Sequence, residues 1–147
     1  STARELPKEG EPAARFAPNE PFEPARTSYD WLSRDEAEVD KYIADPLCGF
    51  ESRKVQNPQR ADPFRLADPA ILAKIRPDLP LLFVAGDADP INNRLRGLEL
   101  LERRWHDAGV QRIDTWYYPG GRHEMLNETN RDEVTADIIG WVESVIA

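Results

Sequence analysis

The second half of the chain opens with a strand pattern followed by a helix pattern. Residues 81–85, LLFVA, form a continuous apolar run between Pro80 and Gly86, which is typical of a strand buried on both faces of a parallel sheet. Gly109 stands where the C-terminal cap of a helix belongs. The apolar residues before it recur at roughly helical spacing: Leu98, Leu101, Trp105 and Ala108.

The same order repeats toward the C-terminus. Residues 112–118, RIDTWYY, are β-branched and aromatic and predict a second strand. Thr129 or Asn130 can cap a final helix. That helix carries five apolar residues on one side: Val134, Ile138, Trp141, Val142 and Val145. The order strand, helix, strand, helix predicts a parallel sheet with a right-handed crossover and one further packing helix.

The first half differs, because eleven of the 13 prolines lie in residues 1–80. Proline lacks a backbone donor and fixes φ, so this half cannot hold long helices or central strands. We expect one helix over residues 33–44, which starts with a capping box formed by Ser33 and Glu36. A second, short helix is expected over residues 69–75.

Two parallel strands do not make a stable open sheet, whose faces both need covering by helices. The first 80 residues show no third strand pattern. We therefore expect an α/β fold in which residues 80–147 are the C-terminal strand–helix–strand–helix part of a larger parallel sheet. Residues 1–79 are expected to form a proline-rich connecting segment.

Composition and charge narrow the function classes. The net charge of −8 would repel a nucleic acid or an anionic membrane surface, and no Lys/Arg run offsets it, so no nucleic acid partner is expected. No stretch approaches 18 apolar residues, so no membrane span is predicted. The single cysteine, Cys48, excludes an intramolecular disulfide and favours a thiol-reducing, cytoplasmic location.

The sequence predicts no metal or cofactor. Residues 87–98 fail as a calcium loop, because position 6 is Asn92 rather than glycine and position 12 is Leu98 rather than glutamate. His106 and His123 are the only histidines, and with one cysteine they do not suffice for a typical zinc site.

Titratable residues follow both predicted strands directly. GDAD over residues 86–89 follows the first strand, and GGRH over residues 120–123 follows the second. Ligands of open parallel sheets bind beyond the carboxyl ends of the strands, where adjacent loops meet. A carboxylate there could accept the Nδ1 proton of His123 and leave Nε2 to act as a general base. The alternative is that Asp87 and Asp89 are turn-forming aspartates and that the histidine is a solvated loop residue.

Sequence motifs in several places are shared with a known enzyme group. They read LPLLFVAGDADPIN, then YYPGGRHEMLNE, then GWVESVI at the terminal helix. As a set they resemble the C-terminal end of α/β-hydrolase serine enzymes, in the branch of monoacylglycerol lipases, lysophospholipases and serine aminopeptidases. FEPARTSYDWLSRDEAEVDKYIADPLCGF further resembles the stretch that follows the lid in bacterial members. The resemblance covers most of residues 16–147 and implies that residues 1–79 derive from the lid region.

The resemblance implies a role for each titratable residue. Asp89 would be the acid and His123 the base of a Ser–His–Asp triad that hydrolyses carboxylic esters, whereas Asp87 would not be catalytic. The nucleophile of this family sits in a G-x-S-x-G elbow on an earlier strand. No serine of this chain lies in such a motif: Ser1, Ser28, Ser33, Ser52 and Ser144.

We therefore expect the C-terminal portion of an esterase- or lipase-like serine hydrolase. Its nucleophile would come from an N-terminal half of the same enzyme, which is separate from this chain or otherwise outside it, and the isolated chain would be inactive. The alternatives are a catalytically inactive, hydrolase-derived binding module and an interaction protein that docks a partner through its proline-rich half.

Overall fold

The computed structural model describes residues 17–49 and 68–147. The first part contains two short elements: η1 (Glu20–Phe22) and α1 (Glu36–Ala44). The second part contains α2 (Pro69–Leu72), β1 (Leu81–Gly86), α3 (Arg96–Asp107), β2 (Ile113–Tyr118), η3 (Met125–Asn127) and α4 (Arg131–Ile146). The segment predicted over residues 1–79 therefore falls partly outside the described residues, and its boundary at residue 79 stays a prediction.

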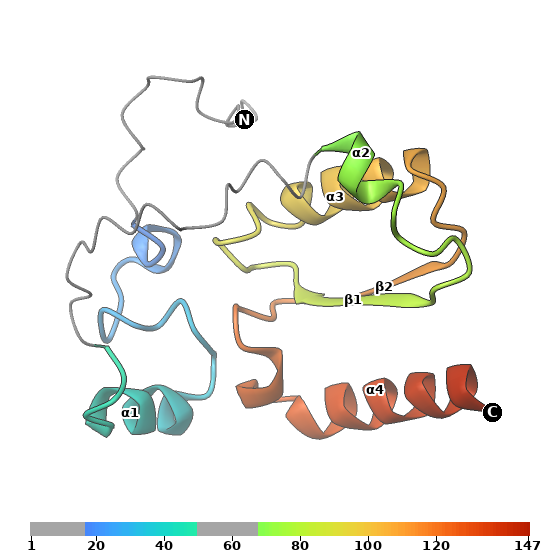
Figure 1. Cartoon of the computed structure of the whole chain (residues 1–147). Coiled ribbons are helices and arrows are strands. Elements are labelled where there is room, and N and C mark those ends of the chain that lie inside the picture. The colour runs from blue at the N-terminus through green and yellow to red at the C-terminus, as the bar shows by residue number, and fades with distance from the viewer. Residues whose placement is uncertain (1–16, 50–67) are drawn as a thin grey trace, which may run out of the picture.

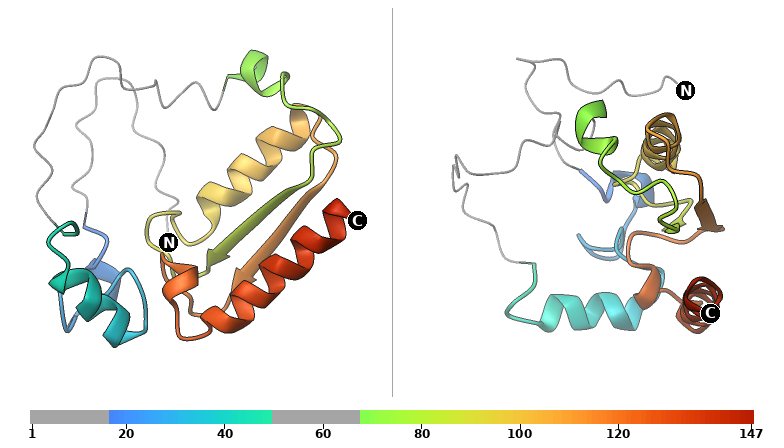
Figure 2. Two further views of the ribbon diagram at one scale, coloured as in Figure 1. Left: turned by 60° about the horizontal axis from the view of Figure 1, so that its bottom comes forward. Right: turned by 45° about the vertical axis from the view of Figure 1, so that its right-hand side comes forward.

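The two strands form a parallel pair, as the sequence predicts. Their register runs from Leu81 opposite Ile113 to Gly86 opposite Tyr118. Helix α3 lies along one face of the pair and α4 along the other, so that the strands are sandwiched between two helices (Figures 1 and 2). Residues 17–49 lie beyond the carboxyl ends of the strands (Figure 2). The loops that follow β1 and β2 therefore face this segment.

The buried core lies between the sheet and α4. Tyr118, Met125 and Val134 form its centre, and three partly buried residues pack against them: Val84, Trp116 and Ile138. On the opposite face, the ring centroids of Phe83 in β1 and Trp105 in α3 are 5.5 Å apart. Apolar contacts thus hold one helix on each face of the sheet.

The first strand is less buried than its sequence predicts. Only Ala85 and Gly86 are buried, whereas Leu81 to Val84 are half-buried. The physical reason is that, among the described residues, β1 pairs with β2 alone and leaves its other edge without a neighbouring strand. The continuous apolar sequence LLFVA is typical of a parallel strand whose two faces are covered and whose two edges pair with neighbouring strands.

The capping box predicted for the first helix is wrong. Helix α1 begins at Glu36, and the N-cap is Asp35, whose carboxylate accepts from the amides of Ala37 and Glu38. The hydroxyl of Ser33 instead accepts from the amide of Asp35 and donates to the carbonyl of Asn127, 2.8 Å away. The hydroxyl binds a residue 94 positions away in the chain and therefore does not cap the helix.

The other helix boundaries differ from the sequence pattern by small amounts. The short helix ends at Leu72 rather than at residue 75. Asn130 precedes α4 as predicted, but its side chain makes no capping hydrogen bond. Gly109 follows α3 with a φ of 102°, a left-handed conformation that favours glycine, so the predicted helix end is confirmed.

Candidate active site

Asp89 and His123 meet at the carboxyl ends of the two strands. The Oδ2 atom of Asp89 lies 3.1 Å from Nδ1 of His123, and the other carboxylate oxygen accepts the amide of Ile91 at 2.7 Å. Asp89 is 6% exposed, whereas the side chain of His123 is 38% exposed. The predicted meeting of the two loops is therefore confirmed. A buried carboxylate on Nδ1 selects the tautomer in which Nε2 faces away as the proton acceptor.

The loop after β1 (residues 86–89, the acid loop) is fastened to the loop after β2 (residues 119–124, the histidine loop). The carboxylate of Asp87 accepts the amide of Gly120 at 2.7 Å, and the amide of Ala88 donates to the carbonyl of Gly121 at 3.0 Å. A Cβ on Gly86 would overlap the Gly121 carbonyl. The close approach of these two backbones therefore requires glycine at position 86.

Two further amides of the histidine loop bind the segment that precedes α1. The amide of His123 donates to the carbonyl of Trp31 at 3.4 Å, and that of Glu124 donates to Leu32 at 2.8 Å. The Trp31 ring also lies against the His123 ring, with the centroids 5.2 Å apart. Residues 31–32 thus form one wall of the site, although they lie about 90 positions earlier in the chain.

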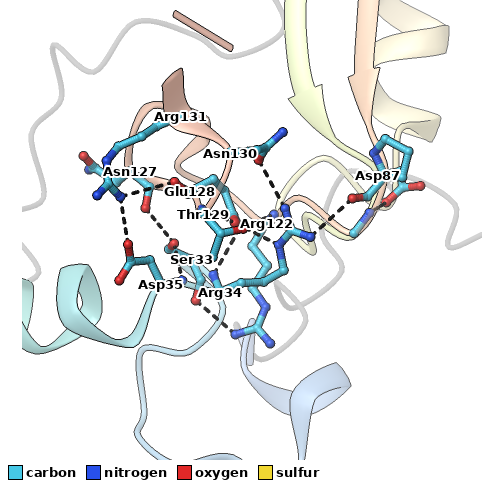
Figure 3. Close-up of polar contacts among 12 residues, drawn as sticks. Ser33, Arg34, Asp35, Asp87, Arg122, Asn127, Glu128, Thr129, Asn130 and Arg131 are labelled. Atoms are coloured by element: carbon cyan, nitrogen blue, oxygen red, sulfur yellow. Dashed lines mark hydrogen bonds and ion pairs between the residues drawn. The ribbon is translucent and has the colours of Figure 1, made fainter. Parts of the chain in front are cut away.

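A buried carboxylate, that of Glu128, holds the backbone of the histidine loop. Glu128 is fully buried, and its Oε1 atom accepts the amides of Arg34 at 3.1 Å and Arg122 at 2.9 Å (Figure 3). Its Oε2 atom accepts Nε of Arg34 at 2.8 Å and the amide of Thr129 at 3.0 Å. Burial raises the pKa of Glu128, but the hydrogen bonds to Arg122, Arg34 and Thr129 together hold it below its ordinary value.

The side chain of Arg122 extends from the histidine loop to the segment that precedes α1. Its Nη1 atom donates to the carbonyls of Asp30 and Ser33, and its guanidinium lies 4.2 Å from the centre of the Phe22 ring. In the other direction, the guanidinium of Arg34 donates to the carbonyl of Pro119 in the histidine loop. It also donates to the side chain of Asn130 (Figure 3). Residues 22–34 and the histidine loop are therefore one interlocked unit.

Sequence reasoning predicted that the loops of Asp89 and His123 meet, but it gave no indication of Glu128, Arg34 and Arg122. Glu128 stands among polar neighbours in the sequence LNETN, which gives no sign of burial. Arg34 lies next to a predicted helix cap, where a solvated arginine is ordinary. Only the folded chain shows that Glu128 binds the guanidinium of Arg34 and the backbone amides of Arg34 and Arg122 (Figure 3).

The other reactive side chains do not join the site. His106 belongs to α3, and its Nδ1 atom lies 3.0 Å from the carbonyl of Val110. Burial and the nearby Asp45 carboxylate raise the pKa of the Cys48 thiol, which disfavours the nucleophilic thiolate. The hydroxyls of Ser33 and Ser144 donate to backbone carbonyls. In residues 17–49 and 68–147, no serine hydroxyl is hydrogen-bonded to the ring of His123.

The described part of the chain lacks both a metal-binding cluster and a membrane-spanning helix. It contains no group of three or more histidine, cysteine, aspartate or glutamate side chains that could hold a metal ion. None of its helices is long and apolar enough to cross a bilayer.

Residues 6–130 match the family model Hydrolase_4, described as serine aminopeptidase, S33. The chain belongs to this family. Six chains of solved structures match this S33 family member, and one is a highly thermostable carboxyl esterase from Bacillus coagulans, in complex with glycerol. The two superpose with a TM-score of 0.70 and 26% sequence identity over 88% of this chain and 43% of the esterase. No curated protein matches.

These similarities confirm the predicted α/β-hydrolase fold. The chain spans less than half the length of the Bacillus coagulans esterase. In this S33 family member, Asp89 and His123 are arranged so that a carboxylate can orient an imidazole and stabilise its positive charge.

Proposed function

We propose that this chain is the C-terminal portion of a serine hydrolase that acts on carboxylic esters. Asp89 and His123 are the acid and the base of a Ser–His–Asp triad, and the serine lies outside this chain. The observation that supports the proposal is the 3.1 Å contact between Asp89 Oδ2 and His123 Nδ1 at the ends of two adjacent parallel strands. The description of a structural neighbour as a carboxyl esterase supports an ester as the substrate class.

The proposed reaction uses both ring nitrogens of His123. As the serine hydroxyl attacks the ester carbonyl, Nε2 takes its proton, and the buried Asp89 carboxylate stabilises the imidazolium through Nδ1. When the tetrahedral intermediate collapses, Nε2 returns the proton to the departing alkoxide. Water then attacks the acyl-enzyme by the same route and releases the carboxylic acid. The oxyanion donors, like the serine, belong to the proposed N-terminal half.

The sheet edge supports an N-terminal half as the partner. Within the described residues, β1 pairs on one side only, and the apolar residues Leu81 to Val84 remain half-buried. Unpaired strand edges and exposed apolar surface are expected where a neighbouring part of the sheet is missing. Among the described residues, seven further large apolar residues are at least 40% exposed: Ile43, Leu47, Ile91, Leu126, Ile139, Val142 and Ile146.

A fluorophosphonate probe, which reacts covalently with activated serines, tests the proposal on the protein purified from its native source. We expect intact-mass spectrometry to find the label on a G-x-S-x-G serine, in a polypeptide that is continuous with this chain or that co-purifies with it. His123→Ala should prevent the labelling, because the serine then lacks its base. If the protein from its native source proves to be this sequence alone, folded, monomeric and unlabelled, the proposal is contradicted and a non-catalytic binding module is favoured.

A further inference from the structure

We propose that Glu128 is a positioning residue for His123, and that it acts by fixing the peptide unit between Gly121 and Arg122. This inference rests on the proposed function for its kinetic test, but its spectroscopic test is independent of hydrolysis. Glu128 is fully buried, so it is not placed to touch a substrate. Any effect on turnover must therefore pass through the backbone that carries His123.

The peptide unit that joins Gly121 to Arg122 is held at both ends. Its carbonyl oxygen accepts the amide of Ala88 in the acid loop at 3.0 Å, and its N–H donates to Oε1 of Glu128 at 2.9 Å. The next residue in the chain is His123. The acid loop and Glu128 together therefore set the position of the His123 backbone relative to Asp89.

A neutral side chain could not replace the Glu128 carboxylate. All four of its partners are donors: the amides of Arg34, Arg122 and Thr129, and the guanidinium of Arg34. An ionised carboxylate offers about four acceptor sites and no donor, so it satisfies all of them. In a glutamine, one of the two oxygens is replaced by an NH₂ group. That group would face N–H donors and could not accept their hydrogen bonds. The cost of burying the Glu128 charge is offset by the Arg34 guanidinium and by three amide dipoles.

The same carboxylate connects the wall of the site to the histidine loop. Arg34 donates to Glu128 through both its backbone and its side chain, three residues after Trp31 and two after Leu32. Those two residues accept the amides of His123 and Glu124. Loss of Glu128 would therefore release the histidine loop from two sides at once. A shift of about 1 Å in a catalytic base can cost about a hundredfold in rate.

The first test is the proton on His123 Nδ1, observed by NMR in the full chain with ¹⁵N-labelled histidine rings. The chain contains two histidines, so His106→Gln assigns the signals. We expect a downfield, exchange-protected Nδ1–H resonance from His123 in the wild type. Glu128→Gln should broaden or remove it while the amides of β1 and β2 stay protected. Glu143→Gln, the same change at an exposed glutamate of α4, should leave it in place. A folded Glu128→Gln chain with the resonance intact would overturn the proposal.

The second test is steady-state kinetics of the complete enzyme on a short p-nitrophenyl ester. For Glu128→Gln we expect kcat to fall by about tenfold or more while KM stays within about twofold, because a displaced base affects the chemical step rather than binding. Equal changes in both constants, or none, would overturn the proposal. A wild-type enzyme without hydrolysis would instead contradict the proposed function, and the Nδ1–H resonance would still decide the role of Glu128.

A second variant covers the case in which Glu128→Gln does not fold. Arg34→Met removes one of the four donors and leaves the carboxylate with its three amide partners. We expect a smaller loss in the same direction, about threefold in kcat, and a broadened His123 Nδ1–H resonance. If Arg34→Met folds and changes neither kcat nor the resonance, the proposal is wrong.

Discussion

The Oδ1 atom of Asp87 lies 2.7 Å from the backbone nitrogen of Gly120 and ties the acid loop to the histidine loop. Two residues further on, Asp89 faces the ring of His123 instead. The two aspartates of the GDAD turn therefore do different things. One holds the backbone of the histidine loop, and the other holds the imidazole.

This difference predicts unequal effects of the same substitution in the complete enzyme. Asp89→Asn should lower kcat for a p-nitrophenyl ester by about 10⁴-fold, by analogy with triad acids on other folds, because the amide supports the wrong histidine tautomer. His123→Ala should lose at least as much. Asp87→Asn keeps an oxygen that can accept the Gly120 amide, so we expect a loss of less than about tenfold. Comparable losses for the two aspartates, measured by steady-state kinetics, would contradict the assignment of Asp89.

The close approach of the two loops predicts opposite effects of one substitution at two glycines. Gly86→Ala places a methyl group against the carbonyl of Gly121 and should lower the free energy of unfolding by about 1–3 kcal/mol. Gly140→Ala is the matched control in α4, where a Cβ meets nothing within 4 Å, and it should stabilise by about 0.5–1 kcal/mol. Urea denaturation monitored by circular dichroism measures both. If Gly86→Ala is as stable as the wild type, the two backbones are not packed as described.

The buried Glu128 carboxylate predicts a stability that depends on acid pH. Burial raises its pKa, but the hydrogen bonds it accepts lower the value overall. A group whose pKa is lowered by folding contributes stability that is fully present above its unfolded pKa, about 4.3, and is lost as the pH falls through the folded value. The free energy of unfolding should therefore decline from about pH 5 downward.

Glu128→Gln should make that decline shallower, by up to about 1.4 kcal/mol per pH unit, because one titrating group has been removed. Urea titrations at several pH values between 3 and 7 measure the slope. Glu143→Gln should keep the wild-type slope, since this residue is exposed and far along α4. Identical slopes for wild type and Glu128→Gln would show that the carboxylate contributes no such linkage.

The contacts of Arg122 predict where the backbone opens when they are lost. Arg122→Met removes the donors to the carbonyls of Asp30 and Ser33 and the stacking on Phe22, while the backbone amide still reaches Glu128. Hydrogen exchange should quicken at the amides of His123 and Glu124, and amides in β2 should stay protected. Arg103→Met, at an exposed position of α3, is the control and should change neither region. Uniform acceleration across the sheet would mean that Arg122 supports the whole fold rather than this wall.

Periodicity and strand-end logic were sufficient to predict the parallel strand pair and the meeting of an acidic loop with the loop that carries His123. The apolar run LLFVA and the aromatic run in RIDTWYY place two adjacent strands, and the residues just beyond each strand end must then be neighbours. These are local signals, and topology brings the two loops together, whereas the choice of Asp89 rather than Asp87 as the acid came from the family resemblance.

What the sequence did not predict depends on contacts between distant segments. Ser33 has the spacing of a capping box, yet its hydroxyl bonds the carbonyl of Asn127 and leaves the cap to Asp35. The burial of Glu128 depends equally on Arg34, 94 residues away. Side chains of this kind carry no periodic signature, because their partners are set by the tertiary fold and not by the neighbouring sequence.

The Asp89–His123 pair is held in place by contacts within this chain. Its supports are supplied from inside this chain: the acid loop, residues 31–34 and Glu128. Under the proposed function, a complementing polypeptide would need to deliver only the nucleophile and the oxyanion donors. Assembly of the two pieces could then be followed as colour released from a chromogenic ester, and their dissociation constant read from a titration. The same division makes the chain a ready component for a split-enzyme reporter of protein association.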